Sequence, residues 1–197
     1  MSRINQLFTS IDNKWKPIGK EPITLQIVGS AALMLQSSYD RGTKDADIID
    51  LSTSIPEATK QLELLAGKES DLCRQFHMYL DLVNSAIMFM PSKPIFHAVK
   101  AIKLKNFAIT AMDITDVVVS KLKRFNGNDR DDILAMVKQK HIRHKVLIKR
   151  FQSAVDQYAI DARSEYLPRY IKNLHMVERD MLFVPESEID LPNWMDR

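Results

Sequence analysis

Apolar positions along the first half of the chain follow helical spacing in some segments and form strand-like runs in others. The spacing i, i+3, i+4, i+7 is occupied by Ile4, Leu7, Phe8 and Ile11. It predicts an amphipathic helix over residues 3–15 that ends before Pro17. The run ITLQIVG, residues 23–29, favours a strand that stops at a glycine, and AALMLQSSY resumes helical character at once. These patterns predict a helix, a strand, a tight turn and a second helix.

The next apolar runs continue the alternation of strands and helices. DADIIDL, residues 45–51, predicts a second strand, and PEATKQLELLAGK predicts a helix that starts at Pro56 and ends near Gly67. MYLDLVNSAIMFM, residues 78–90, is extended at least in part, although its first half could instead continue a helix from Ser70. HAVKAIKLK and FAITAMD predict a short hairpin or a pair of edge strands. Three lysines in this region would limit edge aggregation: Lys100, Lys103 and Lys105.

After Asp113 the pattern becomes helical throughout. The segments that carry it are ITDVVVSKLKRF, DDILAMVKQK, VLIKRFQSAVDQYAI and YLPRYIKNLHMVERDML. The sequence therefore predicts an α/β (α+β) domain with a mixed sheet over residues 1–113 and a helical bundle domain over residues 114–197. The last dozen residues contain several acidic side chains and are expected to form a loose tail.

Composition limits the protein class. The chain has 197 residues, of which 45% are hydrophobic, enough for a substantial core. Its apolar stretches are shorter than the roughly 20 residues that span a bilayer. The first 16 residues lack the form of a secretory signal, and the single cysteine, Cys73, excludes an internal disulfide, so we expect a cytoplasmic protein. A net charge of +3 does not by itself indicate nucleic-acid binding.

Asp45 and Asp47 are separated by one residue within the predicted strand. Residues i and i+2 of a strand project to the same face, so the two carboxylates would lie side by side while Ala46 and Ile48 face the core. Adjacent carboxylates repel each other unless a cation lies between them, and hard oxygen ligands suit Mg²⁺ or Mn²⁺. This arrangement fits the metal-assisted transfer of a phosphoryl or nucleotidyl group.

The Gly29–Ser30 turn lies 15 residues before this pair. Free backbone N–H groups at a helix N-terminus, with a hydroxyl beside them, can cradle a phosphate. Arg41 and Lys44 come just before the carboxylates and are further candidates for nucleotide binding, although an ordinary loop charge explains each of them as well. Taken singly, a glycine turn and a D-x-D triplet are common, and a turn followed by a polar strand is the alternative interpretation.

The order of these segments resembles a known family. G-S-A-A-L, residues 29–33, and R-G-T-K-D-A-D, residues 41–47, are similar to the signature of the DNA polymerase β-type nucleotidyltransferase superfamily. The resemblance is closest to its minimal abortive-infection (AbiEii-type) toxin-like branch, whose downstream lysine helix and acidic segment are similar to S-K-L-K-R-F-N-G-N-D-R-D-D-I, residues 120–133. It implies a nucleotidyltransferase fold that takes an NTP substrate.

The resemblance also implies a metal site. Ser30, Asp45 and Asp47 would hold the nucleotide and the Mg²⁺ or Mn²⁺ ion, with the two aspartates catalytic. Superfamily enzymes usually carry a third carboxylate on a later strand, and the best candidate here is Asp81 in YLDLV. If Asp81 is instead an exposed helix residue, a catalytically inactive nucleotide- or RNA-binding module becomes the better interpretation. Asp50 falls on the opposite face of the strand and is expected to be structural or solvated.

The resemblance extends to the segment after residue 120. It implies that Lys121 contacts phosphate as a catalytic group and that Asp129 or Asp132 lies at the site. Lys121 and Arg124 are three apart and would share a helix face, where they could hold a triphosphate. A solvated basic face for Arg124, and a helix-starting role for one of the aspartates, are the structural alternatives.

The segment KQKHIRHKVLIKR, residues 138–150, contains six Lys or Arg and two His without an acidic residue. It could follow an RNA or DNA phosphate backbone, such as a tRNA acceptor, or it could be a solvated helix face. His141 and His144 have no further metal ligands nearby in the sequence.

These features predict a metal-dependent enzyme that moves a nucleotidyl group from an NTP to an acceptor hydroxyl of RNA, tRNA or protein. The resemblance implies a toxin-like role in abortive infection or a toxin-antitoxin system, with a cognate antitoxin as partner. A different alternative is a helical ribonuclease, because Arg169 and His175 resemble the R-x4-6-H motif of HEPN-type enzymes.

Overall fold

The computed structural model describes residues 2–49, 56–159 and 162–191. The chain forms two compact units. The first contains residues 1–87 and 96–112, and the second contains residues 88–95 and 113–197. Asp50, for which the sequence predicted a structural or solvated position, lies outside the described residues. Within the described residues, no helix is long and apolar enough to cross a membrane.

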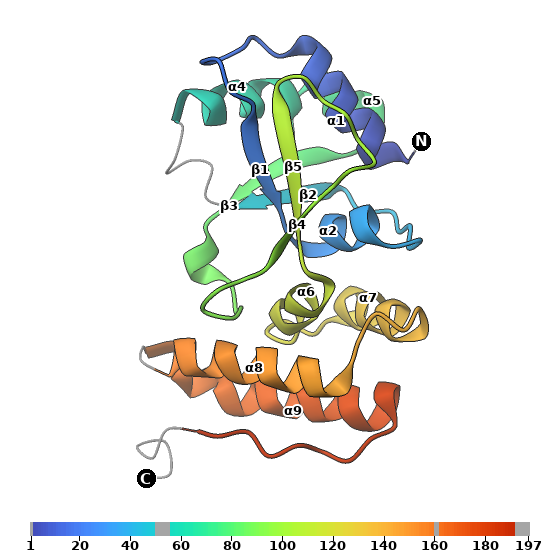
Figure 1. Ribbon diagram of the computed structural model, residues 1–197, viewed down its shortest axis with the longest axis vertical. Helices are drawn as coiled ribbons and strands as arrows, with labels where there is room; N and C mark the ends of the chain where they lie inside the picture. The colour runs from blue at the N-terminus through green and yellow to red at the C-terminus, as the bar shows by residue number, and fades with distance from the viewer. Residues whose placement is uncertain (1, 50–55, 160–161, 192–197) are drawn as a thin grey trace. The chain divides into compact units, whose positions relative to one another are not determined.

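The first unit is built on a five-stranded mixed sheet with the order β3-β2-β1-β5-β4 (Figure 1). Its strands are β1 Ile23–Ile27, β2 Asp45–Ile49, β3 Tyr79–Val83, β4 Phe96–Ala98 and β5 Phe107–Met112. β1 is parallel to β5 and antiparallel to β2, β2 is parallel to β3, and β4 is antiparallel to β5. The α/β class with a mixed sheet, predicted from the sequence, is confirmed.

Alternation along the strands gives the sheet one apolar face. On β1 and β2 the alternating buried side chains are Ile23, Leu25, Ile27, Ala46 and Ile48, and Ile49 at the end of β2 is buried as well. The pairing of Ile27 with Ile48 places these residues on the same side of the sheet. The other positions, apart from Ile49, are polar or charged, and this alternation is the reason that the two aspartates of β2 stay partly exposed.

Four α-helices accompany this sheet among the described residues of the first unit. They are α1 Arg3–Lys14, α2 Gly29–Gln36, α4 Pro56–Ala66 and α5 Asp71–Phe76. The apolar stripe predicted for α1 is completely buried, and α1, α4 and α5 lie together in Figure 1. α5 ends at Phe76 and is capped by His77, and β3 starts at Tyr79, followed by the 3-10 turn η1, Ser85–Ile87. The strand interpretation of Asp81 is therefore confirmed.

The hairpin predicted for residues 97–113 forms, but one of its strands is not at an edge. β4 is the edge strand, whereas β5 lies between β4 and β1. The prediction of two edge strands was wrong for β5 because its alternate residues Phe107, Ile109 and Ala111 pack into the apolar face. The three lysines expected to protect an edge lie in the connection between the strands rather than on β4.

The regular elements of the second unit are helical in its described residues, as predicted for the chain after Asp113. Its elements are α6 Ile114–Lys121, α7 Gly127–Lys138, α8 His144–Tyr158, η2 Ala162–Tyr166, α9 Leu167–Val177 and the π-helical turn η3 Glu178–Leu182. Residues 88–95 belong to this unit. Phe89 is fully buried and makes ring contacts with Phe151, Tyr158 and Tyr170. An aromatic cluster therefore anchors this segment in the helical core.

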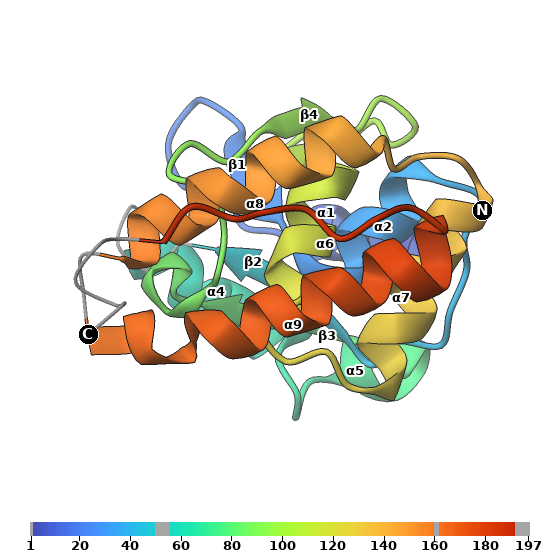
Figure 2. The ribbon, with the colours of Figure 1, turned by 90° about the horizontal axis from the view of Figure 1, so that it is seen from below.

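Hydrogen bonds hold the segment after η3 in place as far as Asp190. Residues 183–191 run as an extended segment along α8 and α9 (Figure 2). The backbone N–H of Ser187 donates to buried Glu178 at 3.1 Å, and the Gln152 amide exchanges two hydrogen bonds with the Asp190 backbone. The predicted loose tail is wrong for these residues because polar side chains of α8 and η3 fix the backbone. Residues 192–197 lie outside the described part.

Candidate functional site

Three carboxylates share one face of the first unit's sheet. Asp45 and Asp47 alternate with fully buried Ala46 and Ile48, as the sequence predicted. In the parallel pairing of β2 with β3, Asp47 is opposite Asp81, and paired residues project to the same face. Asp81 is exposed, and Asp45 and Asp47 are partly exposed. The fold therefore brings the sequence's third-carboxylate candidate beside the pair.

The turn after β1 lies against Asp47. The Val28 N–H donates to the Asp47 carbonyl oxygen at 2.9 Å. Gly29 has a φ of +63°, and a Cβ added there would lie 2.6 Å from Asp47 Oδ2. Glycine tolerates this left-handed conformation and leaves room for the carboxylate. The conformation and the close approach together explain why a glycine stands at this turn.

Ser30 follows in the first turn of α2. Its side chain is 9% exposed, and its hydroxyl oxygen accepts a hydrogen bond of 2.7 Å from Arg41 Nη2. No side-chain hydrogen bond caps the start of α2 at Val28. The structure therefore brings together Gly29, Ser30 and Arg41, three residues predicted to bind a nucleotide. Lys44, a fourth residue predicted to bind the nucleotide, is exposed.

Tyr79 adds a phenol to the carboxylate face. It is opposite Asp45 in the pairing of β2 with β3. Its pKa is raised above the ordinary value by burial and then by the negative charges of Asp45, Asp81 and Asp47. The phenol therefore stays protonated at neutral pH and can donate a hydrogen bond. Because strand register brings Tyr79 to the aspartates, only the correct pairing of two distant strands would have identified it from the sequence.

The carboxylates on this face offer only oxygen donors. Among the described residues, no three His, Cys, Asp or Glu side chains form a group that could hold a metal ion by themselves. Carboxylate oxygens are nevertheless the donors that Mg²⁺ prefers, and this ion commonly keeps waters and binds substrate phosphates in addition. The chemical type of these donors therefore fits a hard divalent cation, with its remaining ligands supplied from outside the described side chains.

Lys121 is buried in an ion-pair cluster of the second unit. Its ammonium lies 3.1 Å from Asp129 Oδ1 and 2.7 Å from Asp132 Oδ2, and all three side chains are 6% exposed or less. The exposed Arg124 donates from Nε to Asp129 Oδ2 at 2.8 Å. Asn126 and Asp129 form a capping box at the start of α7. These four predicted site residues therefore hold α6 against the beginning of α7.

The charge of Asp129 is stabilised by this cluster. Burial alone would raise the pKa of Asp129. Hydrogen bonds and positive charge from Arg124 and Lys121 outweigh burial and hold the pKa below its ordinary value of 3.8. The carboxylate is therefore ionised at neutral pH.

The basic segment 138–150 divides into two parts in the structure. Arg150 binds buried Asp116 through Nε at 2.6 Å. The other basic side chains are exposed and make no ion pair with any described residue: Lys138, Lys140, Arg143, Lys145 and Lys149. His144 contacts Glu178 at 2.7 Å. The exposed residues leave open the predicted contact with a phosphate backbone.

Arg169 and His175 do not form a joint site on α9. They are six residues apart on one helix, so their side chains project roughly 120° from each other. The His175 Nε2 lies 3.1 Å from the Ser187 carbonyl oxygen and therefore donates to it. The structure explains His175 by its contact with the extended segment, and it offers nothing in favour of a HEPN-like ribonuclease.

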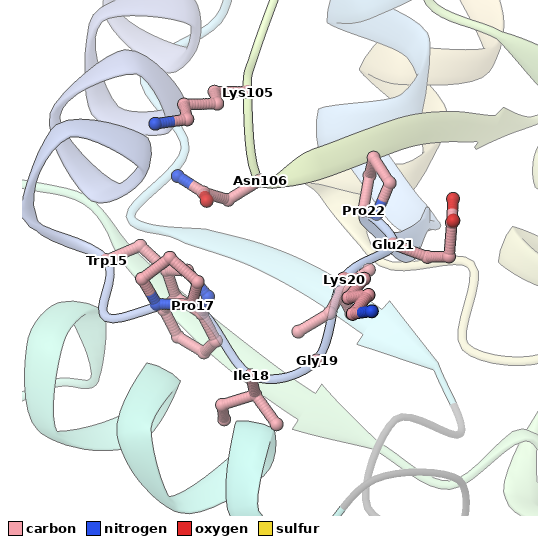
Figure 3. A pocket seen from close by; sticks show the side chains of 10 residues that line it. Trp15, Pro17, Ile18, Gly19, Lys20, Glu21, Pro22, Lys105 and Asn106 are labelled. Carbon is pink, nitrogen blue, oxygen red and sulfur yellow. The ribbon is translucent and has the colours of Figure 1, made fainter.

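A small pocket lies at the opposite end of β1 from Gly29. It has a volume of about 40 Å³ and is lined by the loop before β1, by Ile23 and by Asn106 (Figure 3). The five residues of β1 span about 17 Å, which separates the pocket from the turn beside Asp47. The pocket is therefore distinct from the carboxylate face.

Comparison with known proteins identifies the family to which the chain belongs. No curated protein and no solved structure is significantly similar to the chain. The sequence model of one protein family matches residues 5–180, which include most of both units and every residue predicted for the nucleotide and metal site. By this match the chain belongs to the family described as "Nucleotidyltransferase of unknown function (DUF6036)".

Proposed function

We propose that this protein transfers a nucleotidyl group from an NTP to an acceptor hydroxyl with the help of Mg²⁺ or Mn²⁺. The pairing of Asp81 with Asp47 carries the proposal, because it adds a third carboxylate to the face that already holds Asp45. A D-x-D pair alone is common, whereas three acidic side chains on neighbouring strands, with a glycine turn against one of them, suit nucleotide chemistry.

The residues of the face would divide the work as follows. Asp45 and Asp47 bind the cation, and the Gly29–Ser30 turn holds phosphate oxygens through backbone N–H groups and a hydroxyl. When bound, the metal ion neutralises charge on the triphosphate and helps to align it. Asp81, the most exposed of the three, accepts the proton of the attacking hydroxyl. Arg41 and Lys44 lie in the adjoining loop and complement phosphate charge.

The reaction balances without a further reactant. The acceptor oxygen forms a bond to the α-phosphorus, and the bond from that phosphorus to the bridging oxygen of pyrophosphate breaks. The hydroxyl proton leaves through a carboxylate to solvent, and pyrophosphate departs with the electron pair of the broken bond. In this proposal the ion-pair cluster of Lys121, Asp129 and Asp132 has a structural role, because the ammonium of Lys121 already binds both carboxylates.

The acceptor in this proposal is an RNA, including a tRNA. The support comes from the exposed cations of residues 138–150, which have no acidic neighbour within that segment. Such a surface attracts a phosphate backbone and makes binding sensitive to salt. The likeness of the motifs to AbiEii-type proteins supports a toxin-like role in abortive infection or a toxin-antitoxin system, where an antitoxin would bind the protein.

The test measures label transfer from each NTP to total RNA in the presence of Mg²⁺ or Mn²⁺. The parent is compared with the Asp45→Asn/Asp47→Asn double variant and with Asp81→Asn. Asp71→Asn is the matched control, because Asp71 is an exposed aspartate whose surface ion pair with Arg74 contributes little. We expect transfer by the parent and the control, and a loss of at least about 100-fold in both test variants.

Two outcomes would contradict the proposal. Equal transfer by the parent and the double variant would place the activity elsewhere in the chain. NTP binding by the parent without transfer to RNA or to protein would favour the catalytically inactive module. Circular dichroism of each variant verifies that the loss of carboxylate charge has not unfolded the sheet.

A further inference from the structure

One short loop contacts both Ser30, in the first turn of α2, and Asp45, on β2. Arg41, Gly42 and Thr43 belong to the connection between α2 and β2, residues 37–44. Arg41 Nη2 donates to the Ser30 hydroxyl oxygen at 2.7 Å. Two residues later, the Thr43 hydroxyl donates to Asp45 Oδ1 at 2.8 Å, and it also lies 3.2 Å from the Asp45 carbonyl oxygen. Side chains of this loop therefore hold a residue on either side of the site.

The loop itself has a defined conformation. The Thr43 N–H donates to the Arg41 carbonyl oxygen at 2.7 Å, which closes a three-residue γ-turn around Gly42. The next residue, Lys44, accepts a backbone hydrogen bond of 2.9 Å from the N–H of Tyr79. The turn is thus tied to β3 as well as to β2. The backbone that carries the Arg41 and Thr43 side chains is therefore fixed by the sheet.

The contact between Thr43 and Asp45 is protected from water. Thr43 is only 5% exposed, so water competes poorly for its hydroxyl. A hydroxyl donor supplies a hydrogen bond to the carboxylate without adding positive charge that would repel a cation. Among the described residues, the second Asp45 oxygen, Oδ2, makes no hydrogen bond. Thr43 therefore fixes one oxygen of the carboxylate and leaves the other available.

We propose that Arg41 and Thr43 form a positioning clamp that sets the distance and orientation of Ser30 relative to Asp45. Thr43 is a positioning residue for the cation, because it acts through Asp45. Arg41 positions the Ser30 hydroxyl toward the phosphate. The proposal rests on the proposed function, and it adds Thr43, for which the sequence suggested no role. Partners that orient a metal-binding side chain commonly change metal affinity or activity by 10- to 100-fold when they are removed.

The test compares Thr43→Val with Thr43→Ser. Valine has nearly the shape of threonine but lacks the hydroxyl, whereas serine keeps the hydroxyl and loses only a methyl group. Thr115→Val is the matched control, because Thr115 is also buried, at 6% exposed, but lies in the helical unit. Thermal unfolding of all three variants measures any general loss of stability.

Mn²⁺ binding, followed by electron paramagnetic resonance with and without a non-hydrolysable NTP, is the main readout. We expect Thr43→Val to weaken Mn²⁺ binding by about 10- to 100-fold, with Thr43→Ser and the control close to the parent. In the transfer assay the same variant should require more metal and show a lower kcat. Its KM for the NTP at saturating metal should stay near the parental value. Arg41→Met should instead raise the KM for the NTP and leave Mn²⁺ affinity unchanged.

The outcomes separate the clamp from the function on which it rests. A parent that binds neither Mn²⁺ nor NTP would overturn both proposals. A parent that binds Mn²⁺ and transfers nucleotides, with Thr43→Val equal to it in metal affinity, would overturn the clamp alone. Equal weakening in Thr43→Val, Thr43→Ser and Thr115→Val would also overturn it, since that result would reflect packing rather than the hydroxyl.

Discussion

Replacing Gly29 by alanine should lower both the stability of the fold and the rate of nucleotidyl transfer. A non-glycine residue at a φ of +63° costs about 1–2 kcal/mol. The new Cβ would lie 2.6 Å from Asp47 Oδ2, whereas ordinary contact begins at 3.4 Å, so the oxygen must move by about 0.8 Å. Turning the Asp47 side chain out of its rotamer costs about 1 kcal/mol more. We therefore expect a free energy of unfolding that is lower by about 2–3 kcal/mol.

The same displacement moves a proposed metal-binding oxygen. A misplacement of about 1 Å at a reacting centre can reduce the rate by 100-fold. Gly19→Ala provides the matched comparison, because Gly19 also has a positive φ, +79°, but nothing lies within 4 Å of the added Cβ. It should therefore lose a similar amount of backbone free energy without disturbing Asp47.

The assay measures urea unfolding and nucleotidyl transfer for the parent and for both glycine variants. Gly29→Ala should lose activity by about 100-fold, and Gly19→Ala should retain it although it is also destabilised. Equal activity losses in the two variants would refute the reasoning. Full activity in Gly29→Ala would refute it as well, because it would mean that the position of Asp47 has no bearing on transfer.

Three further predictions concern the helical unit. Asp129→Asn should lower the free energy of unfolding by about 3 kcal/mol at pH 7. The folded pKa of Asp129 is below its unfolded value of about 3.8, so ionised Asp129 contributes to the free energy of unfolding above that pH. This contribution is lost as the pH falls further. Urea titrations from pH 7 to 3 should show the loss in the parent and not in the variant. Arg150→Gln leaves buried Asp116 without its cation and should also cost about 3 kcal/mol, measured by thermal unfolding, with unchanged Mn²⁺ binding. Lys145→Gln/Lys149→Gln should weaken RNA binding and flatten its salt dependence in filter-binding titrations, and an unchanged salt slope would exclude these lysines from the contact.

The sequence was sufficient for elements whose pattern is local. The period of apolar residues in α1 follows from one turn of helix geometry, and the alternation in DADII follows from strand geometry. The turn at Gly29 was also visible, because the strand pattern stops at a glycine and a helix pattern begins. Each of these features depends on residues within one short segment, so no knowledge of the tertiary structure is needed.

Features that depend on strand order or register could not be obtained in the same way. Asp81 and Asp47 are 34 positions apart, and only the parallel pairing of β3 with β2 brings them opposite each other. β5 pairs with β1 across more than 80 residues, which made it central instead of an edge strand. Phe89 packs in the helical core although the chain before residue 88 and directly after residue 95 belongs to the sheet unit. Long-range pairing decides all three cases.

The sequence motif around Lys121 indicates a phosphate-binding role, whereas its buried ion pairs indicate a structural role. As part of S-K-L-K-R it resembles a phosphate-binding lysine, yet its ammonium lies within 3.1 Å of two almost completely buried carboxylates. Removing one partner from such a buried pair costs about 3–5 kcal/mol, because the remaining charge is left uncompensated. A triphosphate that drew Lys121 away would leave the buried charges of Asp129 and Asp132 uncompensated. An NTP that binds with millimolar affinity gains about 4 kcal/mol, so this cost would cancel most of its binding free energy. The cations that can reach a nucleotide at no such cost are those already exposed, of which Lys44 is next to Asp45 in the sequence.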